Sequence, residues 1–214
     1  MKILTIGTGI VGTIYGWVLS DAGHDVTHFV RPGKAAQLPR SIGVDLIDKR
    51  ARYKQHTLTH YTLKATETLS PDDGYNLILV PVKVYQLEPL LRQVGKQTGQ
   101  ADYLILTSLW GNLDVIDTLI PRERYLLGDA LAGGTFREGT LVAGLRQQIP
   151  LGEPGRKQTG RLQRMADVFE QAGLRPTLYP NILHYKWVEY ATNAPATVPD
   201  RDAKLGAGRG LCAE

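Results

Sequence analysis

The first twelve residues constrain the fold more than any other part of this chain. Lys2-Ile3-Leu4-Thr5-Ile6 has the composition of a buried strand, and three glycines follow it in the pattern Gly-x-Gly-x-x-Gly. An apolar pattern at helical spacing comes next, and residues 25–30 form a second strand-like segment. A glycine turn that connects a strand to a helix, with a second strand following, presents backbone amides and a helix N-terminus to a pyrophosphate. The segment therefore predicts a dinucleotide site built on Gly7, Thr8, Gly9, Ile10, Val11 and Gly12.

Alternating strand and helix patterns predict the fold class. The apolar runs at residues 76–82 and 102–107 are typical of central parallel strands, and residues 84–94 and 113–119 have helical spacing. This alternation predicts an α/β protein with a Rossmann-type doubly wound parallel sheet. Residues 44–63, where apolar side chains alternate with charged and Thr or His side chains, are predicted to form an antiparallel ribbon.

The second half of the chain is expected to close this domain and to begin another. The predicted elements are Gly-rich antiparallel strands within 126–151, a helix over 156–172, a strand over 174–179 and a helix from Asn181 to about Thr192. From Pro195 onward no periodic pattern remains, so we expect a loose tail. The predicted domains are a dinucleotide-binding Rossmann domain, residues 1–179, and the start of a truncated C-terminal helical substrate domain, residues 180–214.

Composition excludes several classes of function. No uninterrupted apolar stretch approaches the about 20 residues that a membrane span needs, and the start of the chain lacks the features of a signal peptide. The 25 Lys and Arg exceed the 21 Asp and Glu only slightly and are spread along the chain, which argues against nucleic acid binding. Cys212 is the only cysteine, so no disulfide or thiolate metal cluster is available. We expect a cytoplasmic protein without a metal.

The segment after the second predicted strand favours one dinucleotide over another. An NAD-type site places a carboxylate there, whereas this chain has Arg31 and Lys34. A guanidinium fork suits a 2′-phosphate and a lysine adds a point charge, so NADP is the favoured cofactor. The alternative is that Arg31 is a solvated surface side chain.

An ordered set of motifs extends from this turn to the last predicted helix. Taken together over about residues 1–194, the set resembles the ketopantoate reductase family, the 2-dehydropantoate 2-reductases and their relatives. The segments that carry the resemblance are the glycine turn, Arg31, Val80-Pro81-Val82-Lys83, Leu126-Leu127-Gly128, Leu151-Gly152-Glu153 and Asn181 to Trp187 ahead of Asn193.

The resemblance implies an NADP-dependent reduction of a 2-oxo acid, such as ketopantoate, to a 2-hydroxy acid, as in pantothenate biosynthesis. The site would lie in the cleft between a Rossmann domain and a helical domain. Lys83 matches a lysine that lies near nicotinamide and substrate in the family, with Val82 beside it. Asn193 is implied to contact the substrate or to support the site.

Three positions depart from the family pattern: Trp110, Glu189 and Thr197, the last of which stands where the family has the second asparagine of an Asn-x-x-x-Asn pair. Trp110 stands where the family has an asparagine ahead of a glycine, so Asn112 is the candidate to replace its amide toward the cofactor. Glu189 stands where the family has its general-acid lysine. An ionised carboxylate would repel the alkoxide formed from a ketone, so Glu189 would need a raised pKa to act as the acid. Otherwise Lys186, one helical turn earlier, would have to point into the cleft.

Several interpretations therefore remain open. One is a conventional ketopantoate reductase, a second is a divergent oxidoreductase with another carbonyl substrate, and a third is a dinucleotide-binding protein without turnover. The aromatic residues Tyr185, Trp187 and Tyr190 are typical of a core or an interface, and their exposure would favour a homodimer. His56 and His60 have metal-ligand spacing only on a helix, whereas they fall in the predicted ribbon, which argues against zinc.

Overall fold

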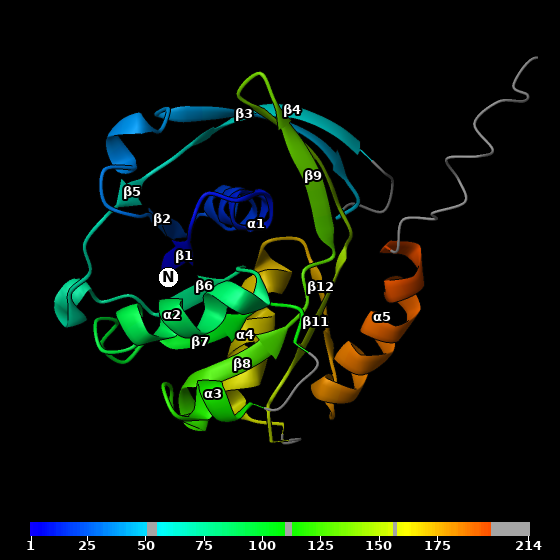
Figure 1. Ribbon diagram of the computed structural model, residues 1–214. Coiled ribbons are helices and arrows are strands. Elements are labelled where there is room, and N and C mark those ends of the chain that lie inside the picture. Colours follow the sequence, from blue (N-terminus) through cyan, green and yellow to red (C-terminus); the bar gives the residue numbers. More distant parts are fainter. Residues whose placement is uncertain (51–54, 110–112, 156–157, 198–214) are drawn as a thin grey trace, which may run out of the picture.

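A large twisted sheet forms the centre of the molecule (Figure 1). The structure is a computed structural model that describes residues 1–50, 55–109, 113–155 and 158–197. In spatial order, the sheet consists of β12 (Arg175–Leu178), β11 (Gln148–Gly152), β8 (Tyr125–Gly128), β7 (Asp102–Ile105), β6 (Leu77–Val80), β1 (Lys2–Ile6), β2 (Asp25–Phe29) and β5 (Ala65–Thr66). The helices are α1 (Ile10–Asp21), α2 (Val84–Val94), α3 (Asp114–Asp117), α4 (Gly160–Gln171) and α5 (Ile182–Thr197).

The strand order confirms the predicted doubly wound topology. The run from β8 through β7, β6, β1 and β2 to β5 is parallel throughout, while β11 pairs antiparallel with β8. The chain goes from β1 through α1 to β2 on one side and later returns to place β6 on the other side of β1. The order therefore reverses between β1 and β6, and open α/β sheets bind their ligands at the carboxyl ends of the strands at such a point.

Both faces of the central sheet are buried, which explains the continuous apolar runs in its strands. Side chains alternate between the faces, so Ile3 packs in the core on the side of α1 and α4, while Leu4 packs against α2 and α3. Figure 1 shows α1 lying between the central sheet and a second sheet that arches over it. This second sheet has the order β4 (Gln55–Thr62), β3 (Ser41–Asp48), β10 (Thr140–Leu145) and β9 (Ala132–Arg137).

Several predicted elements differ in detail from the structure. The ribbon over residues 44–63 is the antiparallel pair β3 and β4, but the strands within 126–151 divide between the two sheets. The helix expected from residue 156 begins at Gly160, where the Thr159 hydroxyl accepts a hydrogen bond from the Leu162 amide. The last helix extends to Thr197, five residues beyond the predicted end. The domain boundary after residue 179 stays a prediction.

Candidate functional site

The glycine turn lies between β1 and α1, as the sequence predicts. Gly7 has a φ of +79°, which favours glycine, and its amide donates to the Phe29 carbonyl at 2.8 Å. A Cβ on Gly12 would lie 3.1 Å from Thr5 Cγ2 and 3.2 Å from Pro81 Cγ, so this glycine allows α1 to pack closely on the strand ends. The turn is thereby held against both β2 and the segment after β6.

The open side of the turn fits a diphosphate. A Cβ on Gly9, the N-cap of α1, would meet no atom within 4 Å among the described residues. No side chain of the described residues caps this helix end, so its first amides are available to a ligand. A helix N-terminus with free amides attracts an anion, and the absence of a side chain at Gly9 lets the ligand approach the backbone.

Lys83 lies across the switch point from the glycine turn. It follows β6 and precedes α2, its side chain is exposed, and its amide donates to Gln86 Oε1 at 3.2 Å. The Val82 carbonyl accepts a hydrogen bond from Thr107 Oγ1 at 2.8 Å, which ties the segments after β6 and β7 together. The structure thus brings the glycine turn, Val82 and Lys83 to the same carboxyl edge of the sheet.

Lys186 reaches this edge from α5. Its side chain is buried, and Nζ donates to the Thr107 carbonyl at 3.0 Å and to the Gly128 carbonyl at 2.6 Å. These carbonyls follow β7 and end β8, so the amine lies at the carboxyl ends of two parallel strands. An ammonium has three N–H donors, and these two bonds use two of them.

Burial makes the Lys186 amine easier to deprotonate. Desolvation lowers the pKa of Lys186 to about 8, and the nearby Asp129 carboxylate partly opposes that change. Burial also raises the pKa of Asp129, while Lys186 acts in the opposite direction. A lysine with such a pKa can give up a proton near neutral pH, as a general acid must.

The other predicted residues of α5 lie on later turns. Glu189 is half-buried and lies three residues beyond Lys186, and the backbone of Asn193 continues the same helix. Glu189 lines a groove of about 360 Å³ between α5 and the second sheet. The lining residues are Lys49, Leu131, Ala132, Gly133, Gly144, Leu145, Arg146 and Glu189.

The loop after β2 carries Arg31 and Lys34, both exposed. The Lys34 amide donates to the Arg31 carbonyl at 3.0 Å, which closes a turn. A carboxylate from outside the loop, Glu67, accepts hydrogen bonds from the Gly33 amide at 2.9 Å and the Ala35 amide at 2.7 Å. The Glu67 carboxylate is therefore bound to the same loop that carries Arg31 and Lys34.

A buried histidine links the glycine turn to the second sheet. His28 Nδ1 lies 2.7 Å from the Gly7 carbonyl oxygen, and Nε2 lies 3.0 Å from the Tyr61 hydroxyl. The carbonyl can only accept, so Nδ1 carries the proton and Nε2 of the neutral ring accepts from Tyr61. Burial lowers the pKa of His28. The neutral ring thus holds the carbonyl of the first glycine in the turn.

His28 is expected to make the protein less stable in mild acid. Because its pKa is lowered by folding, the unfolded state binds the proton more readily, so the stabilisation is complete above about pH 6.5 and is lost as the pH falls below it. His28→Asn keeps a donor for Gly7 and should reduce this pH dependence, by at most about 1.4 kcal/mol per pH unit. Urea unfolding at pH 7.5 and pH 5.5 measures the difference.

The exposed His60 provides the control for this experiment. His60→Asn gives the pH dependence of the free energy of unfolding after replacement of an exposed histidine, and the His28→Asn value is compared with it. Folding also lowers the pKa of His24, but that contribution is common to all three proteins. Equal pH slopes for His28→Asn and the unaltered protein would contradict the assignment to His28.

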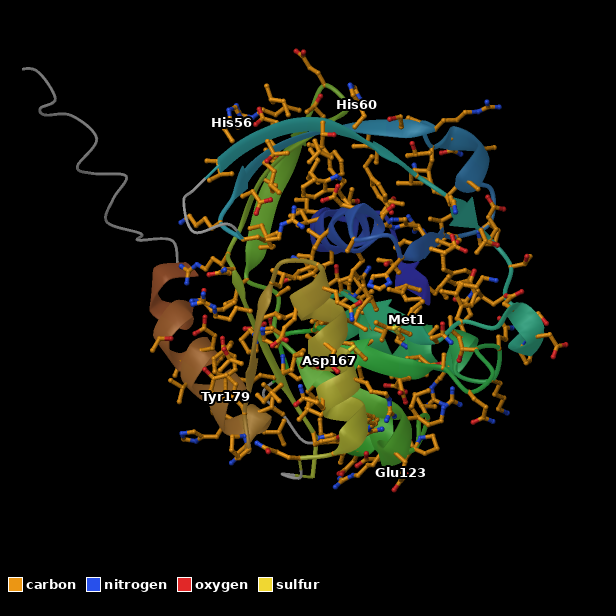
Figure 2. All side chains as sticks on the ribbon, turned by 180° about the vertical axis from the view of Figure 1, so that it is seen from behind. Met1, His56, His60, Glu123, Asp167 and Tyr179 are labelled. Atoms are coloured by element: carbon orange, nitrogen blue, oxygen red, sulfur yellow. The ribbon has the colours of Figure 1, made fainter. Side chains whose placement is uncertain are left out.

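Some predicted residues lie elsewhere. Trp110 and Asn112 lie outside the described residues. Figure 2 shows His56 and His60 on the outer strand β4, and His56 Nε2 lies 2.5 Å from Asp45 Oδ1. Among the described residues, no helix is both long and apolar enough to cross a bilayer.

Fold and site together define a class of protein. The parallel strand order, the reversal between β1 and β6, and the glycine turn at that point are those of a Rossmann-type dinucleotide-binding domain. The family model for ketopantoate reductase PanE/ApbA matches residues 3–155. The chain belongs to this family.

Individual proteins are similar to this chain in sequence or in fold. The 2-dehydropantoate 2-reductase of Pyrococcus horikoshii is 26% identical over 198 residues, which are 91% of this chain and 61% of the relative. The crystal structure of the 2-dehydropantoate 2-reductase from Geobacter metallireducens has a TM-score of 0.70 at 24% identity and covers 91% of this chain and 63% of its own. A D-mandelate dehydrogenase with NADH and anilino(oxo)acetate has a TM-score of 0.68 at 20% identity over 90% of this chain and 61% of its own. The chain thus spans about three fifths of the length of these proteins.

Proposed function

We propose that this protein is an NADP-dependent oxidoreductase that reduces a 2-oxo acid of the ketopantoate type to a 2-hydroxy acid. The observation that carries the proposal is the meeting of the glycine turn with Lys83 at the point where the strand order reverses. Membership of the ketopantoate reductase family supports the reaction class, and the similarity to 2-dehydropantoate 2-reductases supports the substrate class.

The cofactor is proposed to lie along the carboxyl edge of the sheet. The turn from Gly7 to Gly12 binds the pyrophosphate through its amides after Gly7, because the Gly7 amide donates to the Phe29 carbonyl. Arg31 with Lys34 binds the 2′-phosphate of the adenosine ribose. Val82 lies at the nicotinamide end, where we also place Trp110 and Asn112. When bound, the nicotinamide supplies the hydride for the reduction.

The protein's own groups are proposed to handle the substrate and the proton. Lys83 is exposed beside the switch point and attracts the carboxylate of a 2-oxo acid. Lys186 holds a proton at Nζ and stabilises negative charge on the substrate oxygen. We place Glu189 and Asn193 at the substrate side of the site, without assigning the proton to Glu189. Burial of the Lys186 amine among carbonyls makes it the better candidate for the acid.

A turnover assay tests this function. Purified protein is incubated with NADPH and a panel of 2-oxo acids, ketopantoate included, and the loss of absorbance at the nicotinamide band is followed. Oxidation that depends on one of these acids supports the enzyme. Tight NADPH binding with no oxidation across the panel would instead indicate a dinucleotide-binding protein without turnover.

Arg31 is expected to recognise the 2′-phosphate. Arg31→Gln should weaken NADPH binding by about 10–150-fold, because it removes a charge-assisted hydrogen bond worth about 1.5–3 kcal/mol. NADH has no 2′-phosphate, so its dissociation constant should stay within about twofold. Isothermal titration calorimetry with both coenzymes measures this, and Arg137→Gln, an exposed arginine at the end of β9, is the control. Equal losses for both coenzymes would show that Arg31 serves the loop instead of the phosphate.

The assembly and the location of the protein stay predictions. The apolar residues Trp187 and Val188 on α5 are 55% and 49% exposed. This exposure favours the predicted homodimer, because contact with a second copy would remove their apolar surface from water. We also propose that the protein acts in the cytoplasm, with neither nucleic acid nor a membrane as partner.

A further inference from the structure

The loop proposed to hold the 2′-phosphate already binds an anion of its own chain. Glu67 Oε2 accepts a hydrogen bond from the Gly33 amide at 2.9 Å, and Oε1 accepts one from the Ala35 amide at 2.7 Å. Successive amides in a turn form a concave anion site. In this loop, the carboxylate of Glu67 takes that position.

The topology puts Glu67 beside Arg31. Strand β5 pairs parallel with β2, Phe29 lies opposite Thr66, and the Val30 amide donates to the Thr66 carbonyl at 2.9 Å. Glu67 is the first residue after β5 and Arg31 is the second residue after β2, so both follow the ends of paired neighbouring strands. The hydrogen bonds from Gly33 and Ala35 lower the pKa of Glu67, so it is ionised at neutral pH.

We propose that Glu67 is a specificity-determining residue that opposes the 2′-phosphate and lets the protein accept NADH as well as NADPH. The inference rests on the proposed cofactor site. Glu67 accepts from the Gly33 and Ala35 amides, and the Lys34 amide donates to the Arg31 carbonyl, so the side chains of Arg31 and Lys34 are what this loop offers to the phosphate. The carboxylate adds a negative charge next to a group that carries between one and two negative charges of its own.

The same carboxylate suits the ribose of NADH. NAD-type Rossmann sites place a carboxylate after the second strand to accept a hydrogen bond from the 2′-hydroxyl. Here the neighbouring strand β5 supplies it. A carboxylate has about four acceptor positions and the two amides use two of them, so Glu67 keeps acceptor capacity for a hydroxyl.

Calorimetric titration of both coenzymes tests the proposal. The unaltered protein should bind NADPH and NADH with dissociation constants within about tenfold of each other. Glu67→Gln keeps the size of the side chain and removes its charge, so it should tighten NADPH binding about fivefold. It should weaken NADH binding about threefold, because the bond from the 2′-hydroxyl then goes to a neutral acceptor. The control is Glu123→Gln: Glu123 lies ahead of β8, which four strands separate from β5, and near α3 in Figure 2.

The outcomes separate this inference from the cofactor proposal. Binding of both coenzymes with the same ratio in Glu67→Gln as in the unaltered protein would overturn the inference alone, as would a parallel weakening of both. If Glu67→Gln does not fold, the ratio in the unaltered protein decides, and a preference for NADPH well above tenfold overturns the role of Glu67. Binding of neither coenzyme to folded protein would overturn the proposed function and this inference together.

Discussion

Lys186→Met is expected to slow the reduction of the 2-oxo acid by about 10²–10⁴-fold, the range typical for loss of a general acid. Methionine fills a similar volume but carries no proton and no charge for the developing alkoxide. The rate of the unaltered protein should fall as the pH rises through about 8, where Lys186 loses its proton. The variant should lack this pH dependence. Steady-state rates between pH 6.5 and pH 9.5 measure both effects.

A structural role for Lys186 must be separated from a chemical one. Loss of the amine leaves the Thr107 and Gly128 carbonyls without this donor, which costs about 1–3 kcal/mol for each buried group. This cost is within the stability of a typical domain, about 5–15 kcal/mol, so the variant should stay folded. Circular dichroism and NADPH titration at 15 °C should then show a folded protein that binds the coenzyme normally. Lys96→Met, at an exposed lysine, should leave the rate unchanged. Full activity in Lys186→Met would refute the assignment.

Glu153→Leu is expected to lower the free energy of unfolding by about 3–5 kcal/mol, because it leaves a largely buried guanidinium without its counterion. The Glu153 side chain is 4% exposed and pairs with Arg161, which is 13% exposed. Arg161 Nε donates to Glu153 Oε1 at 3.0 Å, and the Thr159 hydroxyl donates to the same oxygen. These bonds join the end of β11 to the start of α4. Urea denaturation measures the loss.

Two comparisons isolate this ion pair. Adding Arg161→Leu to Glu153→Leu should recover part of the lost stability, because no unpaired charge remains buried. Glu88→Leu removes an exposed carboxylate that pairs with Arg92 at 2.7 Å on α2, and it should cost less than about 1 kcal/mol. Similar losses for Glu153→Leu and Glu88→Leu would show that burial contributes little to the first pair.

Much of the central sheet could be predicted from local patterns. Strands buried on both faces form continuous apolar runs, and the helix predicted over residues 84–94 matches α2 from Val84 to Val94. The partners of the later strands could not be predicted in this way. β10 pairs with β3, about a hundred residues earlier, and nothing in the local alternation of either strand specifies that register.

The candidate site was predictable only where a motif marks it. The glycine pattern and Lys83 stand next to strands that the sequence makes recognisable. Glu67 follows a strand of two residues, too short to form a pattern, and His28 depends on Tyr61 from another sheet. The burial of Lys186 likewise results from contacts with Thr107 and Gly128, which are far away in the sequence. Such groups acquire their chemistry from tertiary contacts.

The position of α1 between two sheets has a consequence for coenzyme affinity. Its residues from Gly12 to Leu19 are all buried, so the helix whose first turn faces the diphosphate is fixed before any ligand arrives. A receptor that is already rigid loses little conformational entropy on association, so more of the contact energy appears as affinity. Differences in coenzyme preference among close variants of this chain should then arise in the surface loops around the ribose, while the helix and its turn stay a constant anchor.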